Sequence, residues 1–154
     1  RVLFRSRIDE FDAELIATAR DDEACRRLCE IPGIGALNAT ALVAAVGNGA
    51  AFSKGRDMAA WLGLVPRQHS TGGKPRLLGI SKRGNTYLRT LLIHGARAAL
   101  PHLAARDDAL GSWLRRLLAR VHRNVAVVAL ANKLARIAWA VLSGSRRYGA
   151  SANA

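Results

Sequence analysis

Acidic side chains are missing from a long central part of this sequence. No Asp or Glu lies between Met58 and Arg106, although many basic residues do. The acids that flank this stretch, Asp57, Asp107 and Asp108, are too few and too scattered to predict a two-metal cluster. We therefore expect no metal site and no cofactor within this chain, and any Mg²⁺ would be held by carboxylates outside it.

Cysteine and methionine are also scarce. Cys25 and Cys29 lie one helical turn apart, but no second cysteine pair or nearby histidine completes a zinc set, so we expect reduced packing cysteines. The only methionine is Met58 and the sequence opens at Arg1, which indicates a piece of a longer polypeptide. There is no signal-peptide pattern and no apolar run near the roughly 20 residues of a membrane span. We expect a cytoplasmic protein without a membrane partner.

Positive charge is abundant and unevenly placed. The 154 residues, half of them hydrophobic, are enough for one domain with a real core. The net charge is +13; residues 1–50 carry 6 basic and 8 acidic residues, whereas residues 51–154 carry 18 and 3. Such a field attracts a polyanion. The alternative is an ordinary solvated surface.

The first 24 residues predict an amphipathic, coiled-coil-like lead-in helix. Phe4, Ile8, Phe11 and Leu15 recur at alternating steps of four and three. This seam would pair with another subunit or with a missing part of the protein. An ordinary amphipathic core helix explains the pattern equally well.

A Pro-Gly-x-Gly turn follows. Pro32, Gly33 and Gly35 separate two helical stretches, which predicts a helix-hairpin-helix whose free amides take a phosphate oxygen. A plain helix-turn-helix packing unit is the alternative.

The rest of the chain predicts a mainly α fold with one irregular part. We expect a short helix over Gly55–Leu62, an irregular Gly-rich loop or small β-hairpin over Gly63–Gly79, helices over Arg83–Leu100, Asp108–Val121 and Asn124–Leu142, and a tail over residues 143–154. On the Arg83–Leu100 wheel, one face is apolar: Tyr87, Leu88, Leu91, Leu92, Gly95, Ala96 and Ala99. The opposite face is basic: Arg83, Thr86, Arg89, Thr90, His94 and Arg97.

Ser70 lies in the irregular segment, surrounded by basic residues. It lacks the partners of a serine hydrolase, because His69 is its direct neighbour and no G-x-S-x-G elbow is present. What remains is a serine that attacks a phosphodiester, with cations stabilising the developing charge. The available donors are Lys74, Arg76, Lys82, Arg83 and Arg89. The alternative is a simple turn serine.

Five short motifs occur in order. They are Gly33-Ile34-Gly35, Ala60-Trp61-Leu62-Gly63-Leu64-Val65-Pro66, Ser70-Thr71-Gly72-Gly73-Lys74, Gly79-Ile80-Ser81-Lys82-Arg83-Gly84-Asn85 and Leu88-Arg89-Thr90-Leu91-Leu92. Together they resemble the C-terminal domain of the DEDD-plus-serine insertion-sequence transposases, the IS110 group that includes the Piv-type DNA invertases. The match covers about residues 25–142, including Asn132-Lys133-Leu134-Ala135-Arg136.

The resemblance implies a DNA recombinase built from two parts. An N-terminal RuvC-like domain with four acidic ligands would hold Mg²⁺, and the C-terminal domain would carry the serine nucleophile. Members of the group are guided by a noncoding bridge RNA and work as oligomers, so we expect DNA, a guide RNA and a homo-dimer or tetramer as partners. The acidic domain is absent here, so this chain should not cleave alone.

Carried onto this sequence, the resemblance makes Ser70 the residue that links covalently to DNA. Thr71 and Ser81 are the competitors, although Ser81 suits a helix cap better. Nucleic-acid contacts are expected from Gly33, Gly35, Lys74, Arg76, Lys82, Arg83, Arg89 and Arg97. Two rival hypotheses are a non-catalytic DNA- or RNA-binding module and an assembly domain built on the Phe4–Leu15 seam.

Overall fold

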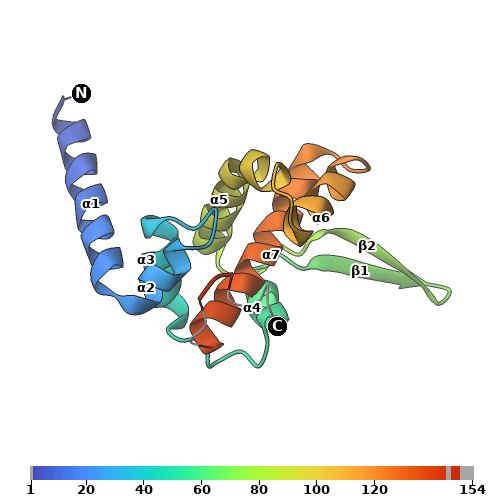
Figure 1. Cartoon of the computed structure of the whole chain (residues 1–154). Coiled ribbons are helices and arrows are strands. Elements are labelled where there is room, and N and C mark those ends of the chain that lie inside the picture. Colours follow the sequence, from blue (N-terminus) through green and yellow to red (C-terminus); the bar gives the residue numbers. More distant parts are fainter. Residues whose placement is uncertain (1, 145–146, 150–154) are drawn as a thin grey trace.

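Seven helices and one two-stranded sheet make up the part of the chain that this computed structural model describes, residues 2–144 and 147–149 (Figure 1). In chain order they are α1 (Val2–Asp21), α2 (Glu23–Cys29), α3 (Ala36–Val46), α4 (Gly55–Trp61), β1 (Pro66–Thr71), β2 (Lys74–Ile80), α5 (Thr86–Ala104), α6 (Ala109–Leu118) and α7 (Arg123–Gly144). The prediction of a mainly α fold with a small hairpin is confirmed.

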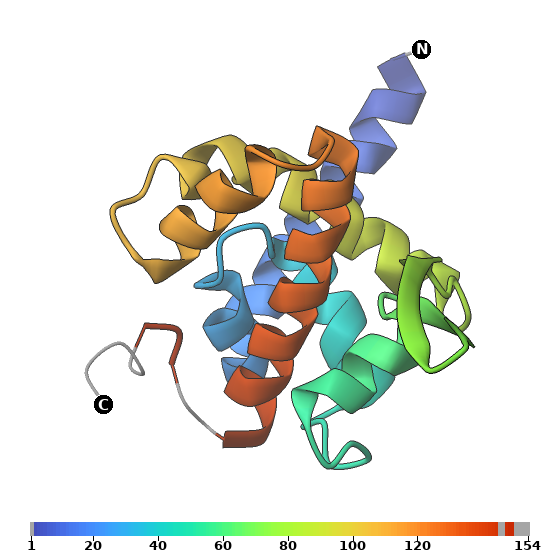
Figure 2. The same cartoon turned by 90° about the vertical axis from the view of Figure 1, so that its right-hand side faces the viewer.

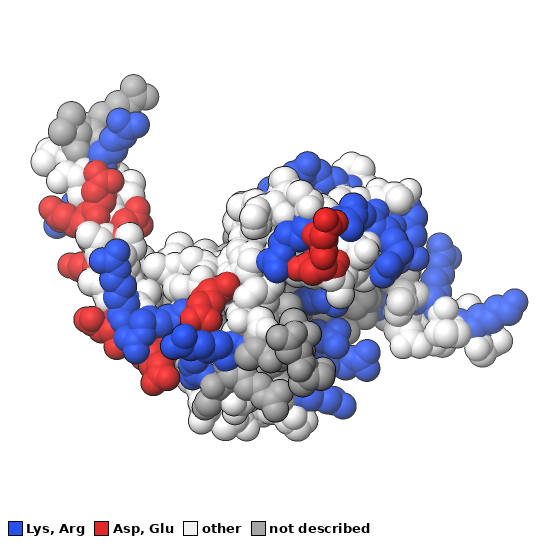
Figure 3. All heavy atoms as spheres, in the orientation of Figure 1, with Lys and Arg blue, Asp and Glu red and all other residues white. Residues whose placement is uncertain are grey.

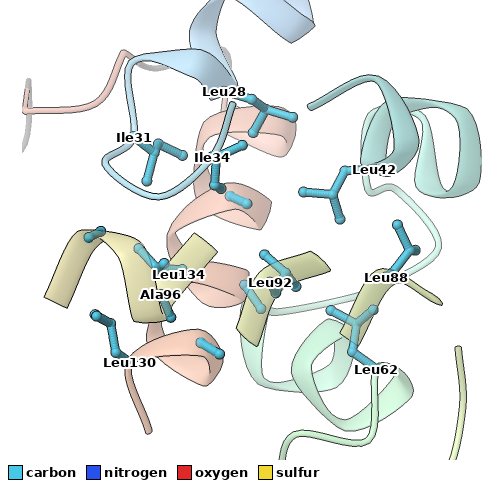
Figure 4. Packing of buried hydrophobic residues seen from close by; sticks show 14 of the residues in the cluster. Leu28, Ile31, Ile34, Leu42, Leu62, Leu88, Leu92, Ala96, Leu130 and Leu134 are labelled. Atoms are coloured by element: carbon cyan, nitrogen blue, oxygen red, sulfur yellow. The ribbon is translucent and has the colours of Figure 1, made fainter. Parts of the chain in front are cut away.

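Helix α7 runs through the centre of the molecule (Figure 2). Its buried residues recur at steps of three and four and form one broad apolar face: Ala126, Val127, Leu130, Ala131, Leu134, Ala135, Ala138, Val141 and Leu142. In the core, Leu130 and Leu134 belong to one hydrophobic cluster with buried side chains of α2, α3, α4 and α5 (Figure 4). Because each fully buried leucine contributes about 1.5–3 kcal/mol, this face provides much of the folding free energy.

Helix α7 is also long and apolar enough to cross a membrane by length and composition, with a mean hydropathy of 1.7 over its best window. The expectation that no segment has this character is therefore wrong. Half of that window is buried inside the fold, which is typical of a core helix. The helix also carries Lys133 and Arg136 in the turns that follow its most apolar part.

Helix α1 projects away from the rest of the molecule (Figure 1). Phe4 and Phe11 are 79% and 61% exposed, and Ile8 is exposed too. Leu15 is half-buried, and full burial begins at Ala19 near the contact with α2 and α3. Among the described residues the seam is therefore no core face, and the interpretation of α1 as an ordinary core helix is wrong.

The turn between α2 and α3 packs tightly against α5. A Cβ at Gly33, which has φ +91°, would come within 2.9 Å of the Gly95 carbonyl oxygen. Asn38, on α3, donates to the carbonyls of Gly33 (3.3 Å) and Leu91 (3.1 Å), which ties the turn to α5. The backbones of Gly33 and Gly95 thus approach so closely that neither position has room for a side chain, which requires glycine at both.

The hairpin grows from a closely packed base. The amides of Ser81 and Lys82 donate to the carbonyls of Val65 and Gly63, which extends the strand pairing towards α4. A Cβ at Gly84, with φ +111°, would overlap the Trp61 carbonyl oxygen. The segments on both sides of the hairpin therefore touch through backbone atoms.

Helix α5 differs from its predicted wheel at two positions. Arg89 is only 8% exposed, and its guanidinium donates to the Leu62 carbonyl at 3.1 Å and to Thr86 Oγ1 at 3.3 Å. Its predicted place on the exposed basic face is wrong, because the chain at Leu62 and Gly63, just after α4, lies against this guanidinium. Tyr87, predicted to pack, is 59% exposed.

The start of α5 also differs from its prediction. Asn85 is the N-cap and accepts a hydrogen bond from the Leu88 amide at 3.0 Å, so Ser81 does not cap the helix. The Ser81 hydroxyl instead accepts from the Arg83 amide at 3.4 Å, in the segment between β2 and α5.

The remaining predictions concern the cysteines and the tail. Cys25 is buried, and burial raises the pKa of its thiol to about 12, as expected for a packing cysteine. Cys29 is exposed and does not pack, so the prediction is wrong there. The tail over residues 143–154 lies largely outside the described residues; its first two residues continue α7.

Replacing Gly84 by alanine should destabilise the fold strongly. The new methyl group must displace the Trp61 carbonyl, and the alanine must keep a left-handed backbone conformation. Each effect costs about 1–3 kcal/mol, so the free energy of unfolding should fall by roughly 2–6 kcal/mol. Urea unfolding followed by circular dichroism measures this change.

Gly72→Ala is the matched control, because Gly72 also has a positive φ (+59°) but has no neighbour within 4 Å of the added Cβ. It should cost only the left-handed backbone, about 1–2 kcal/mol. Equal losses for the two variants would show that the close approach at Gly84 is unimportant.

Candidate active site and nucleic-acid interface

A two-glycine turn shapes the hairpin that carries Ser70. Thr71 pairs with Lys74, and between them Gly72 and Gly73 have φ values of +59° and +76°. Positive φ at both central positions is the type I′ turn, whose twist matches that of two antiparallel strands. Ser70 is thereby set one pair back from the tip, opposite Pro75.

The Ser70 side chain is exposed on one face of this hairpin. Side chains alternate between the two faces of a strand, and cross-strand partners share a face. Ser70 therefore lies with Gln68, whose Nε2 is 3.4 Å from Ser70 Oγ, and with Pro75 and Leu77. Every residue of β1 is exposed, so the hydroxyl is open to a macromolecular substrate.

Two of the predicted cationic donors lie on the other face. Lys74 pairs with Thr71 and Arg76 pairs with His69, and these partners alternate with Ser70. The hairpin therefore presents a hydroxyl on one side and two cations on the other. It does not bring Lys74 and Arg76 together with Ser70, as the chemistry predicted from sequence would need.

A buried donor and a half-buried donor fix the base of the hairpin. Arg89 holds the Leu62 carbonyl, and Asn132 of α7 donates its amide to the Leu64 carbonyl at 2.9 Å. Lys82, at the end of the hairpin, has φ +55°, the one left-handed non-glycine residue in the described part of the chain. Such strain persists only where the surroundings impose it. The exposed hairpin thus extends from a segment that hydrogen bonds hold in place.

The other predicted contact residues are exposed at the hairpin base and on α5. Lys82 and Arg83 are exposed at the hairpin base. Arg97 is exposed on α5 and donates to Asn124 at 3.1 Å. In Figure 3 the acidic atoms gather mainly on α1, whereas the hairpin and the adjoining body carry mostly Lys and Arg. Charge thus separates in space as it does along the sequence.

The two glycines of the turn before α3 differ in whether the structure requires glycine there. Gly33 needs its positive φ and faces α5. Gly35 is exposed and caps α3 with φ −92°, a conformation that other residues adopt easily, and a Cβ there would meet nothing within 4 Å. The phosphate contacts of this turn stay a prediction, since Gly33 is explained by packing alone.

A cleft of about 770 Å³ lies between the hairpin base and helix α7. Its walls come from β2, α6 and α7, and include Leu78, Ile80, Trp113, Val125 and Val128. Basic side chains line it as well, namely Arg67, Lys82, Lys133 and Arg136. Sequence reasoning missed this cleft. The signal was present in α7, whose apolar residues extend beyond one face to Val125 and Val128.

The described residues do not form a metal-binding site. Within residues 2–144 and 147–149, no group of three or more His, Cys, Asp or Glu side chains is placed to hold a metal ion. Asp22 has a lowered pKa because it accepts the Cys25 amide hydrogen bond as the cap of α2, which is a structural role.

Comparison with known proteins supports the resemblance seen in the motifs. Residues 25–110 match the model of the Transposase IS116/IS110/IS902 family. The chain is 53% identical over 143 residues to a Pseudomonas aeruginosa protein named "Probable family 20 transposase", covering 93% of this chain and 42% of the relative. It is 50% identical over 141 residues to the transposase for insertion sequence element IS1111A of Coxiella burnetii, covering 92% and 39%.

A DNA-inverting protein is among the relatives as well. The pilin gene-inverting protein of Moraxella bovis is 29% identical over 125 residues, covering 79% of this chain and 37% of that protein. The chain spans about two fifths of the length of the curated relatives it matches. Because the family model matches more than half of its residues, this chain belongs to the Transposase IS116/IS110/IS902 family.

Proposed function

We propose that this chain is the serine-bearing domain of a DNA transposase, a recombinase in which Ser70 attacks a phosphodiester. The Ser70 Oγ–phosphorus bond would form while the bond to the leaving deoxyribose oxygen breaks, and the hydroxyl proton would pass to that oxygen through solvent or a neighbouring base. A phosphoserine link keeps the phosphodiester energy for rejoining. The observation that carries the proposal is the exposed Ser70 on an arm with a fixed base.

The surroundings of Ser70 support phosphate as its target. No acidic residue occurs between Met58 and Arg106 to repel a phosphate. Of the donors predicted to assist Ser70, Lys82 and Arg83 at the hairpin base are exposed and do not lie on the opposite face of the strands. Lys74 and Arg76, on the opposite face, would instead contact a flanking phosphate or a second strand.

Metal ions would act from another part of the protein. The described residues lack a suitable ligand set, so no step within this chain is assigned to a metal. The relatives are more than twice as long as this chain, which leaves room for a RuvC-like domain with acidic ligands for Mg²⁺. DNA, a guide RNA and further copies of the protein complete the proposed assembly, in the cytoplasm.

A second candidate function is a non-catalytic DNA- or RNA-binding module. The position of Lys74 and Arg76 on the face opposite Ser70 favours it, because the hairpin then binds phosphate without an attack by the hydroxyl. Both functions predict a steep dependence of binding on salt. Only formation of a covalent adduct separates them.

Ser70→Ala in the full-length protein should abolish the covalent protein–DNA adduct. The measurement is the retarded band of end-labelled substrate DNA on a denaturing gel, which we expect to fall by at least 100-fold because no other atom replaces Oγ. Ser81→Ala and Thr71→Ala are matched hydroxyl deletions and should keep the adduct. An adduct that survives Ser70→Ala, or disappears only with Ser81→Ala, would assign the nucleophile elsewhere.

The isolated 154-residue chain should bind DNA but not cut it, even with Mg²⁺ present. The described residues offer no metal ligand set to activate the reaction. Gel analysis of supercoiled DNA after incubation with the pure chain tests this expectation. Strand cleavage above the level of a Ser70→Ala chain would show that the chain is sufficient by itself.

Phe11→Ala should weaken self-association without affecting folding. The Phe11 side chain is 61% exposed in the single chain, so its loss removes apolar area only from a contact with another subunit. We expect a loss of about tenfold or more in association by analytical ultracentrifugation and an unchanged melting temperature. Asp12→Ala, on the neighbouring exposed position, is the control. Unchanged association in the Phe11 variant would leave the exposed seam without a role in a homo-oligomer.

A further inference from the structure

We propose that the cleft between the hairpin base and helix α7 binds an unpaired segment of nucleic acid, with a base against its apolar wall and phosphates on its basic rim. This inference rests on the proposed interaction with nucleic acid but not on the chemistry of Ser70. It assigns a function to α6 and α7 residues that the hairpin mechanism does not use.

The size and wall of the cleft suit a flat apolar group. Its volume of about 770 Å³ is within the range of roughly 300–1,000 Å³ typical of ligand sites. Val125 is 55% exposed and Leu78 is 43% exposed, on opposite walls. Val128, one turn after Val125 on α7, continues the apolar surface between them. Uncovered apolar area facing across a cleft is stabilised when a base enters it.

The rim of the cleft carries one sign of charge. Arg67 and Lys82 approach from the hairpin base, and Lys133 and Arg136 approach from α7. Among the described side chains that line the cleft, none is Asp or Glu. Four cations without an acidic partner in the lining would repel one another, so an anion that enters the cleft gains from all of them.

A second hollow extends this basic surface along α7. It measures about 490 Å³, shares Lys133 and Arg136 with the cleft, and adds Lys54 and Arg56 at the start of α4. The cations of the two hollows therefore form one continuous basic surface. This continuity favours a strand over a free small anion.

An aromatic ring and a cation meet at the cleft. The Lys133 ammonium lies 4.7 Å from the centroid of the Trp113 ring, which is half-buried. Apolar and aromatic groups beside Lys and Arg are the combination that binds single strands, because the bases stack and the phosphates pair. A duplex keeps its bases stacked inside and would leave the apolar wall uncovered. A purely apolar partner would leave the four cations unpaired.

The test compares strands of equal length on the folded 154-residue chain. The probes are fluorescein-labelled dT12, the RNA strand rU12 and a 12-base-pair duplex, and fluorescence anisotropy gives each Kd. We expect the single strands to bind at least about tenfold more tightly than the duplex. The comparison of dT12 with rU12 shows whether the unpaired segment is DNA or RNA. Measurements in a Ser70→Ala background should give the same values, which separates this inference from the proposed catalysis.

Two variants and one control locate the site. Arg136→Glu should weaken dT12 binding at least tenfold, whereas Arg7→Glu, an identical charge change on the distant helix α1, should weaken it less than threefold. Arg136→Ala should also lower the slope of log K against log salt by about 0.7, the value for one phosphate contact on a single strand. Leu78→Ser keeps the charge, and should weaken single strands threefold to tenfold but leave duplex binding within twofold.

Each other outcome would overturn the proposal. Equal affinity for duplex and single strand would show that phosphates alone are bound. Equal losses for Arg136→Glu and Arg7→Glu would show that only net charge matters. A change of oligomeric state in Leu78→Ser, with unchanged strand binding, would identify the cleft as a contact with another protein copy. Thermal melting by circular dichroism confirms that each variant is folded.

Discussion

The attachment of the hairpin to the helices depends on two side-chain donors, of which Arg89 is buried and Asn132 is half-buried. Arg89 from α5 and Asn132 from α7 each hold one carbonyl of the segment that leads into β1, at Leu62 and Leu64. A buried carbonyl without a partner costs about 1–3 kcal/mol, so these bonds stabilise one path of the chain over its alternatives. Because the segment is held on two sides, the exposed arm beyond it starts from a defined position and direction.

Helix α7 connects this attachment to the rest of the fold. One face fills the core through residues such as Leu130 and Leu134, and the other lines the cleft through Val125, Val128 and Lys133. Because one face of α7 packs in the core and the other lines an apolar cleft, the helix is apolar over most of its surface. This explains why its mean hydropathy reaches that of a membrane span. The same helix therefore serves stability and the proposed recognition of nucleic acid.

The proposed functions occupy separate places on the molecule. On the acidic helix α1, Phe4 and Phe11 are exposed, and the proposed contact with another subunit would form there. Far from it, the hairpin presents Ser70, and the cleft lies beside the hairpin base (Figure 1). Separation of an acidic assembly helix from a basic binding surface keeps the negative charge of α1 away from an incoming phosphate.

Local patterns in the sequence determined the helices, the glycine turns, the seam on α1, the exposed segment around Ser70 and the family. These features depend on periodicity and on residues such as Gly72 and Gly73 that act within a few positions. The tertiary structure alone decided that Arg89 is buried, that Lys74 and Arg76 lie opposite Ser70, and that α6, α7 and the hairpin enclose a cleft. The physical reason is that strand register and helix packing bring together residues distant in sequence, and such contacts leave no periodic signal within either segment.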